Sequence, residues 1–242
     1  MQFFWRFLFI LSLTTCSSSL QAQNADLALA NAEKFYQNKI KGDAFLFTGK
    51  EYAAYRPGLK GTPFFMTDTM QNGIIFYDAN LYKNVPMLYD ISHQQVVIHN
   101  YSRTALLQLL PEKIKYFIFN GHRFEKFDTT SNLESADAIG FYEIVFTGKA
   151  SVLVKRQKSL KEGKVANDPN YRSAPDFFIE NDVFFLRNGN QMFPVSEKNG
   201  VLNALEDRKS LVKKFLRKNH LRFKKNLEKD LITTATYYSS LN

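Results

Sequence analysis

From residue 41 to Val195, apolar residues occur in short runs rich in Phe, Tyr, Ile and Val, and Gly, Asn, Asp or Pro separates one run from the next. Runs of this length and composition are typical of β-strands. The sequence contains no fixed internal repeat and no alternation of strands with helices, which argues against a doubly wound α/β fold. The pattern predicts strands at residues 44–47, 52–55, 63–66, 73–77, 87–91, 95–99, 105–110, 114–119, 123–127, 141–146, 151–155, 177–179, 183–187 and 191–195.

Short turn sequences join several neighbouring strands. Asn120-Gly121 is the strongest of them, because both residue types tolerate positive φ angles. Similar turns are predicted at Asn188-Gly189, Thr147-Gly148-Lys149 and Asp78-Ala79-Asn80. Runs such as FFIENDVFFLR are apolar on both faces and should be covered on both sides. The predicted fold is therefore mainly β (α+β), an antiparallel sandwich or open barrel.

Apolar residues at helical spacing occur near both ends of the chain. Residues 24–40 predict a short N-terminal helix, and residues 159–175, which are polar without periodicity, predict an exposed loop. Asp207 is expected to cap a helix that ends near Asn219, and Asn226 a second one. The apolar stripes of these two C-terminal helices are Leu211, Val212, Phe215 and Leu216 in the first and Leu227, Leu231, Ala235 and Tyr238 in the second.

The first 23 residues have the features of a secretory signal peptide. Arg6 precedes the apolar run 7–13, and cleavage is expected near Ala22. The run is shorter than the roughly 20 residues of a membrane span, so we expect no transmembrane segment in the mature chain. The stretch that ends at Cys16 partly resembles the lipobox of bacterial lipoproteins. We expect export to the periplasm, the outer envelope or the medium, with a lipid anchor at Cys16 as the alternative.

Composition indicates one main domain. The chain of 242 residues has 32 Lys or Arg and 23 Asp or Glu, which gives a formal net charge of +9. Hydrophobic residues make up 45% of the chain, enough for a packed core. We expect a signal at 1–23, a β-rich domain at 24–198 and a basic helical segment at 199–242 that packs on it. A basic balance indicates either anionic partners or solubility alone.

Four stretches, LFTGKEYAAY, GIIFYDANLYKNVPMLYDI, GFYEIVFTGKASVLVKRQK and NGVLNALEDRKSLVKKFLRKNHLRFKKNLEKDL, resemble a family of exported proteins from Bacteroidota that has no established activity. The resemblance covers most of the mature chain and implies export rather than a function. Many members carry a histidine in the stretch where this chain has Thr62, so histidine chemistry is not expected there. Asp68-Thr69-Met70 and Asp128-Thr129-Thr130 resemble the short acceptor of O-glycosylation in these bacteria and should lie on exposed loops.

The stretch LVKKFLRKNHLRFKK concentrates basic residues. Its apolar residues are expected to face the core, so the cations should face solvent at Lys213, Lys214, Arg217, Lys218, Arg222, Lys224 and Lys225. A solvated basic face is the first interpretation, and contact with anionic lipid or an envelope polymer is the second. A nucleic-acid partner is disfavoured because the chain is expected to be exported. The sequence identifies no protein partner.

The sequence contains no motif of a known catalytic centre. Signatures of zinc proteases, serine hydrolases, P-loops and dinucleotide-binding folds are absent, and no catalytic residue is assigned. The histidines are scattered, so no metal or cofactor site is expected at His93, His99, His122 or His220. Four acids on or beside strands could form a glycosidase pair, although turn or pairing roles are preferred for each: Asp78, Asp90, Glu143 and Glu180.

Aromatic residues in the stretch GIIFYDANLYKNVPMLYDI could stack on a sugar or line a hollow for an apolar ligand. These are Phe76, Tyr77, Tyr82 and Tyr89, for which packing in the core is the default interpretation. The sequence as a whole favours a non-catalytic, exported binding or interaction protein of the envelope. A periplasmic carrier of an apolar or lipid ligand is the alternative, and a glycan-acting hydrolase ranks third.

Overall fold

The protein is described by a computed structural model that covers residues 45–47, 49–127, 140–163 and 174–241. By its internal contacts the chain divides into two units, Met1–Phe45 and Leu46–Asn242. All of the described strands and α-helices belong to the second unit. The predicted signal, the predicted helix at 24–40 and the triplet beginning at Asp128 lie outside the described residues.

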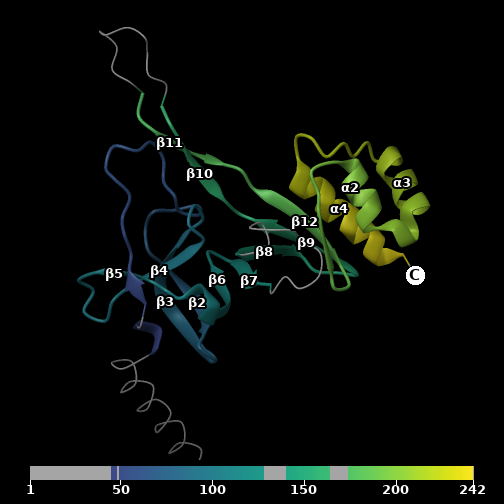
Figure 1. Ribbon diagram of the computed structural model, residues 1–242. Helices are drawn as coiled ribbons and strands as arrows, with labels where there is room; N and C mark the ends of the chain where they lie inside the picture. The colour runs from purple at the N-terminus through teal and green to yellow at the C-terminus, as the bar shows by residue number, and fades with distance from the viewer. Residues whose placement is uncertain (1–44, 48, 128–139, 164–173, 242) are drawn as a thin grey trace, which may run out of the picture. The chain divides into compact units, whose positions relative to one another are not determined.

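One open, antiparallel sheet of eleven strands forms the centre of this unit (Figure 1). Its strand order is β1-β5-β4-β3-β2-β6-β7-β8-β9-β12-β13. Outward from β2 the order follows the chain through β5 on one side and β13 on the other, and β1 is added at the edge beside β5. The strands are β1 (Lys50–Glu51), β2 (Gln71–Tyr77), β3 (Asn80–Asp90), β4 (Gln95–His99), β5 (Leu106–Gln108), β6 (Ile114–Phe119), β7 (His122–Lys126), β8 (Phe141–Phe146), β9 (Ala150–Lys155), β12 (Val183–Asn188) and β13 (Gln191–Pro194). The predicted antiparallel, mainly β (α+β) fold is confirmed.

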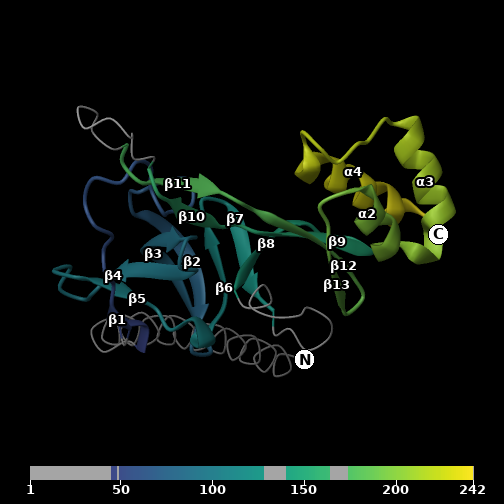
Figure 2. The ribbon, with the colours of Figure 1, turned by 45° about the horizontal axis from the view of Figure 1, so that its top comes forward.

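A further pair of strands, β10 (Lys158–Lys161) and β11 (Phe177–Glu180), continues beyond β9 and β12 (Figure 2). Strand β10 lies where an exposed loop was predicted at 159–175. Its side chains carry no apolar periodicity, because the strand is stabilised by backbone pairing with β11 rather than by one buried face. Sequence periodicity therefore has no signal for this strand.

Three predicted strands in the N-terminal part are wrong. Residues 45–47 form a 3-10 turn, residues 52–55 are irregular, and residues 63–66 contribute one bridge between Phe64 and Asp90. Tyr52 and Phe65 are nevertheless buried. These apolar residues thus anchor an irregular segment to the core. A composition rich in apolar residues does not distinguish such a segment from a strand.

Rings fill the core on the face of the sheet shared by β3, β6, β7 and β8. Phe117 and Phe124 stack with their centroids 4.9 Å apart, and Tyr89 meets both edge-on at 4.9 Å. Phe141 and Phe65 close the cluster from two sides. Each such pair stabilises the fold by about 0.5–1.5 kcal/mol beyond the burial of apolar area.

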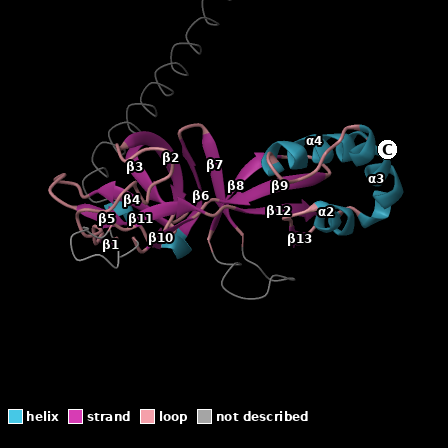
Figure 3. Cartoon of the chain, turned by 90° about the horizontal axis from the view of Figure 1, so that it is seen from above, coloured by secondary structure: helices cyan, strands magenta, loops and turns pink. Residues whose placement is uncertain are grey.

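Three helices follow the last strand, namely α2 (Lys198–Ala204), α3 (Lys209–Lys218) and α4 (Leu227–Ser240), with 3-10 turns at Pro111–Lys113 and Glu206–Arg208 elsewhere in the unit. The helices lie together beside β9 and β12, with α4 in contact with β9 and α2 with β12 (Figure 3). Strands and helices share one apolar core made of Ala150, Val152, Leu186, Val201, Leu205, Val212, Leu216, Leu231 and Ala235. Within the described part of the chain, no helix is long and apolar enough to cross a bilayer.

The two predicted C-terminal helices are present as α3 and α4; the predicted cap of α3 is wrong, whereas Asn226 occupies the cap position of α4 as predicted. Arg208, not Asp207, occupies the cap position of α3, and neither it nor Asn226 makes a capping hydrogen bond. Asp207 instead accepts a hydrogen bond of 2.9 Å from the hydroxyl of Tyr238, and burial together with this bond raises the pKa of that tyrosine. Helix α2 was not predicted, because it is short and contains Gly200.

Replacing Gly73 with alanine is expected to lower the free energy of unfolding by about 1–3 kcal/mol. Gly73 is buried at an irregularity in the pairing of β2 with β3, and a Cβ atom there would lie 2.5 Å from the carbonyl oxygen of Ile118. Urea unfolding measures the loss. Asn72→Ala, at an exposed position of the same strand, should stay within about 0.5 kcal/mol, and equal losses in the two variants would contradict the steric explanation.

Candidate functional site

The helical segment 199–242 concentrates positive charge. It holds ten Lys or Arg and four Asp or Glu, so it contributes 10 − 4 = +6 of the chain's +9. Three of its four acids are held by groups of the fold, Asp207 by the Tyr238 hydroxyl, Glu228 by Arg156 at 2.9 Å and Asp230 by the backbone N–H of Phe223 at 2.9 Å. Three of the four acids thus have partners in the fold, and most of the cations face solvent.

One side of α3 carries four of these cations. Val212 and Leu216 are buried in the shared core, and Phe215 stacks on Tyr237 of α4 with the ring centroids 3.9 Å apart. The opposite side of the helix, called the α3 face, exposes Lys213, Lys214, Arg217 and Lys218.

Leu211 was predicted in the apolar stripe of α3, and this prediction is wrong, because its side chain is 41% exposed. At 100° per residue, Leu211 lies closer around the helix to Lys214 and Lys218 than to the buried Val212 and Leu216. The α3 face is therefore a basic surface with one apolar side chain in it.

The connector between α3 and α4 holds the remaining predicted cations. Phe223 lies within it at φ +54° with its ring buried, and its backbone N–H is bound to Asp230. This anchor fixes the chain so that the residues around it point outward: Arg222, Lys224 and Lys225 are all exposed. The phenylalanine in this basic stretch therefore serves the core.

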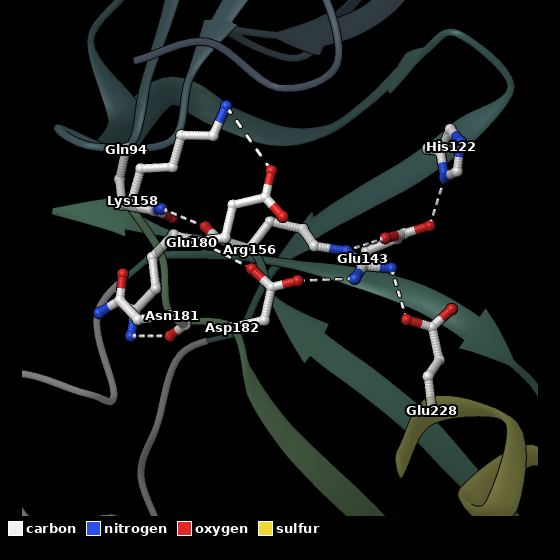
Figure 4. Close-up of polar contacts among 10 residues, drawn as sticks. Gln94, His122, Glu143, Arg156, Lys158, Glu180, Asn181, Asp182 and Glu228 are labelled. Carbon is white, nitrogen blue, oxygen red and sulfur yellow. Dashed lines mark hydrogen bonds and ion pairs between the residues drawn. The ribbon is translucent and has the colours of Figure 1, made fainter. Parts of the chain in front are cut away.

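A buried polar network links the start of α4 to the sheet (Figure 4). Arg156, whose side chain is 14% exposed, follows β9 and binds three carboxylates: Nε to Glu143 at 2.6 Å, Nη1 to Asp182 at 2.7 Å and Nη2 to Glu228 at 2.9 Å. Glu143 also contacts Nδ1 of His122. The backbone carbonyl of Arg156 accepts a hydrogen bond of 2.8 Å from Gln94.

The charge of Arg156 is held strongly by these partners. Burial acts to lower the pKa of the guanidinium, but the hydrogen bonds of Asp182 and Glu143 and the nearby charge of Glu228 outweigh it and raise the pKa above its usual value. The three carboxylates share this one guanidinium, so each is held in place as its ion-pair partner. We therefore interpret the network as structural.

The aromatic residues predicted to contact a ligand do not share one cavity. Tyr77 and Tyr89 are fully buried, and the hydroxyl of Tyr89 donates to Gln94 at 2.8 Å. Phe76 stacks on Tyr116 with centroids 5.6 Å apart, and Tyr82 is half-buried. The two buried rings belong to a filled core and are inaccessible to a ligand.

The four acids considered for glycosidase chemistry each have their own partners. Asp78 pairs with Lys113 at 3.0 Å, and Glu180, which is 75% exposed, lies 3.8 Å from Lys158. Asp90 is buried and accepts hydrogen bonds from the hydroxyls of Tyr52 and Tyr55 and from the N–H groups of Ser92 and His93. Burial and the charge of Asp90 raise the pKa values of both tyrosines.

The histidines remain separate in the fold. His93 stacks on Tyr55, His122 contacts Glu143, and His220 is exposed in the connector. In the described ranges, no three His, Cys, Asp or Glu residues are grouped so that they could hold a metal ion. Thr62 accepts a hydrogen bond from the N–H of Phe64, and Asp68-Thr69 lies exposed as predicted for a modification acceptor.

Comparison of the chain with protein-family models, with curated proteins and with solved structures finds no match. The candidate site consists of the α3 face and the exposed cations of the connector. These two groups of cations follow each other in the sequence, and buried residues of the same elements anchor them to the shared core.

Proposed function

We propose that this protein is exported and acts without catalysis as an envelope protein that docks on an anionic lipid surface through its C-terminal helices. The observation that supports this most strongly is the separation of charge. Three of the four acids of the segment have partners in the fold, whereas the α3 face has no salt bridge to any residue in the described part of the chain. Each Lys or Arg close to an anionic membrane contributes about 1 kcal/mol to binding.

The exposed Leu211 supports a lipid surface over a soluble polyanion. An apolar side chain between cations can enter the interface of a bilayer while the cations remain among the headgroups. A soluble polymer offers no apolar phase for it. Nucleic acid is disfavoured by the proposed export, and an envelope polymer is the competing anionic partner.

The alternative function, a carrier that holds its ligand among the aromatic residues, loses support in the fold. Tyr77 and Tyr89 are at 0% exposure, so a ligand among them would require the core to open. A glycan-acting hydrolase loses support because Glu143 is bound by Arg156 and the other acids have separate partners. The docking function needs no change in the fold.

Sedimentation with vesicles tests the proposal on the unaltered protein. Binding to vesicles that contain phosphatidylglycerol is expected, with at least about a tenfold loss between about 50 mM and 500 mM salt, because salt screens exposed charges. Vesicles of phosphatidylcholine alone are the control and should bind far less. Equal binding to both vesicles, or binding to soluble polyphosphate without binding to anionic vesicles, would refute docking on lipid.

A further inference from the structure

A shallow hollow of about 630 Å³, largely open to solvent, lies beside the first two turns of α4 and Phe184 of strand β12. Its size is within the range of sites for small molecules. Part of its lining is apolar, from Phe184, Leu227 and Ile232, and part is basic, from Lys224, Lys225 and Lys229. Such a lining matches a ligand with one apolar and one anionic end.

The acid in this lining does not cancel the positive charge, because three lysines face one carboxylate, which leaves 3 − 1 = +2. Glu228 also directs its carboxylate to Nη2 of Arg156 at 2.9 Å. The other polar members, Asn226 and Thr233, are uncharged, and the hydroxyl of Thr233 donates to the carbonyl oxygen of Lys229. The three lysines therefore set the charge that a ligand meets.

We propose that this hollow binds a single anionic amphiphile, with its hydrocarbon chain on the apolar lining and its headgroup at the lysines. The inference deepens the proposed function and rests on it, because it names a lipid-like molecule as the ligand of the same helical segment. The hollow is nevertheless separate from the α3 face. Helix α3 packs on Tyr237, ten residues beyond Leu227 and thus about 15 Å along the axis of α4.

Titration calorimetry with decyl phosphate below its micellar concentration tests the inference. Decyl phosphate should bind at least about tenfold more tightly than decyl maltoside, which lacks the charge, and than inorganic phosphate, which lacks the chain. Each methylene added to the chain should strengthen binding by up to about fourfold until the apolar lining is covered. Equal affinity for decyl phosphate and either control compound would overturn the proposal.

Two threonines of α4 give a matched pair of variants. Thr233 lines the hollow, whereas Thr236 is exposed outside it, and each hydroxyl donates to the carbonyl four residues earlier. Thr233→Trp should fill the hollow and lower the affinity for decyl phosphate at least tenfold, and Thr236→Trp should leave it unchanged. If Thr233→Trp does not fold, Lys229→Gln replaces it, with an expected loss of about fivefold. Equal affinities in lining and control variants would refute the site.

The two proposals fail differently. If the protein binds anionic vesicles but not decyl phosphate, the hollow is overturned and docking on the surface stands. If it binds neither, the proposed function is overturned together with the inference that rests on it. Binding of decyl phosphate that the Thr233→Trp variant abolishes supports the hollow.

Discussion

Replacing Arg156 with methionine is expected to lower the free energy of unfolding by about 3 kcal/mol. The change leaves Glu143, whose side chain is 5% exposed, in the interior without the guanidinium that binds it at 2.6 Å. Removal of one partner of a buried ion pair is costly because the remaining charge loses its main counter-ion without regaining hydration, and Glu143 would keep only its contact with His122. Asp182 and Glu228 are more exposed and can regain water, so Glu143 accounts for most of the loss.

Urea unfolding of two further variants checks this explanation. Arg56→Met removes an arginine from an exposed pair with Asp176 and should cost less than about 1 kcal/mol. Adding Glu143→Gln to Arg156→Met should recover part of the loss, because the buried charge is then gone. A loss from Arg156→Met no larger than that from Arg56→Met would show that the network does not tie α4 to the sheet.

Strands and helices were predictable where two local signals in the sequence agree, the apolar pattern of the element and the turn residues at its end. Strand β6 has the predicted bounds, because an alternating apolar run there ends at Asn120-Gly121, whose φ angles of +50° and +80° form the predicted turn. The same agreement was absent at 52–66, where apolar residues are buried without a strand ladder. Burial of a side chain and pairing of its backbone are separate properties, and composition reports only the first.

The site was predictable only in its charges. The exposure of the α3 face follows from helical spacing, which the sequence contains. The binding of Asp207 to Tyr238 and of Glu228 to Arg156 joins residues 31 and 72 positions apart, and no local pattern encodes such partners. The hollow was missed for the same reason, since Phe184 and Lys229 belong to elements that meet only in the fold.

Replacing all four residues of the α3 face with glutamine is expected to weaken binding to anionic vesicles by about a thousandfold. At about 1 kcal/mol for each cation near the membrane, the four changes sum to about 4 kcal/mol. The cations of the connector remain, so the residual binding should still fall with added salt. Sedimentation at about 50 mM salt measures the change.

A matched variant separates position from net charge. Glutamine at Lys50, Lys60, Lys83 and Arg103 removes the same charge from exposed residues outside the helical segment and should keep vesicle binding within about threefold. Comparable losses in the two quadruple variants would mean that net charge alone governs binding, and that the α3 face has no special role.

The melting temperature of the variant with glutamine at all four positions of the α3 face tests whether these cations stabilise the fold. Lys213 with Arg217, and Lys214 with Lys218, are like charges at i,i+4 on one helix, which costs about 0.2–0.5 kcal/mol per pair. Their removal should therefore leave the melting temperature unchanged or raise it slightly. A basic surface that is not needed for folding is explained by a partner outside the chain. A fall in melting temperature with unchanged vesicle binding would instead assign these cations to the stability of the fold.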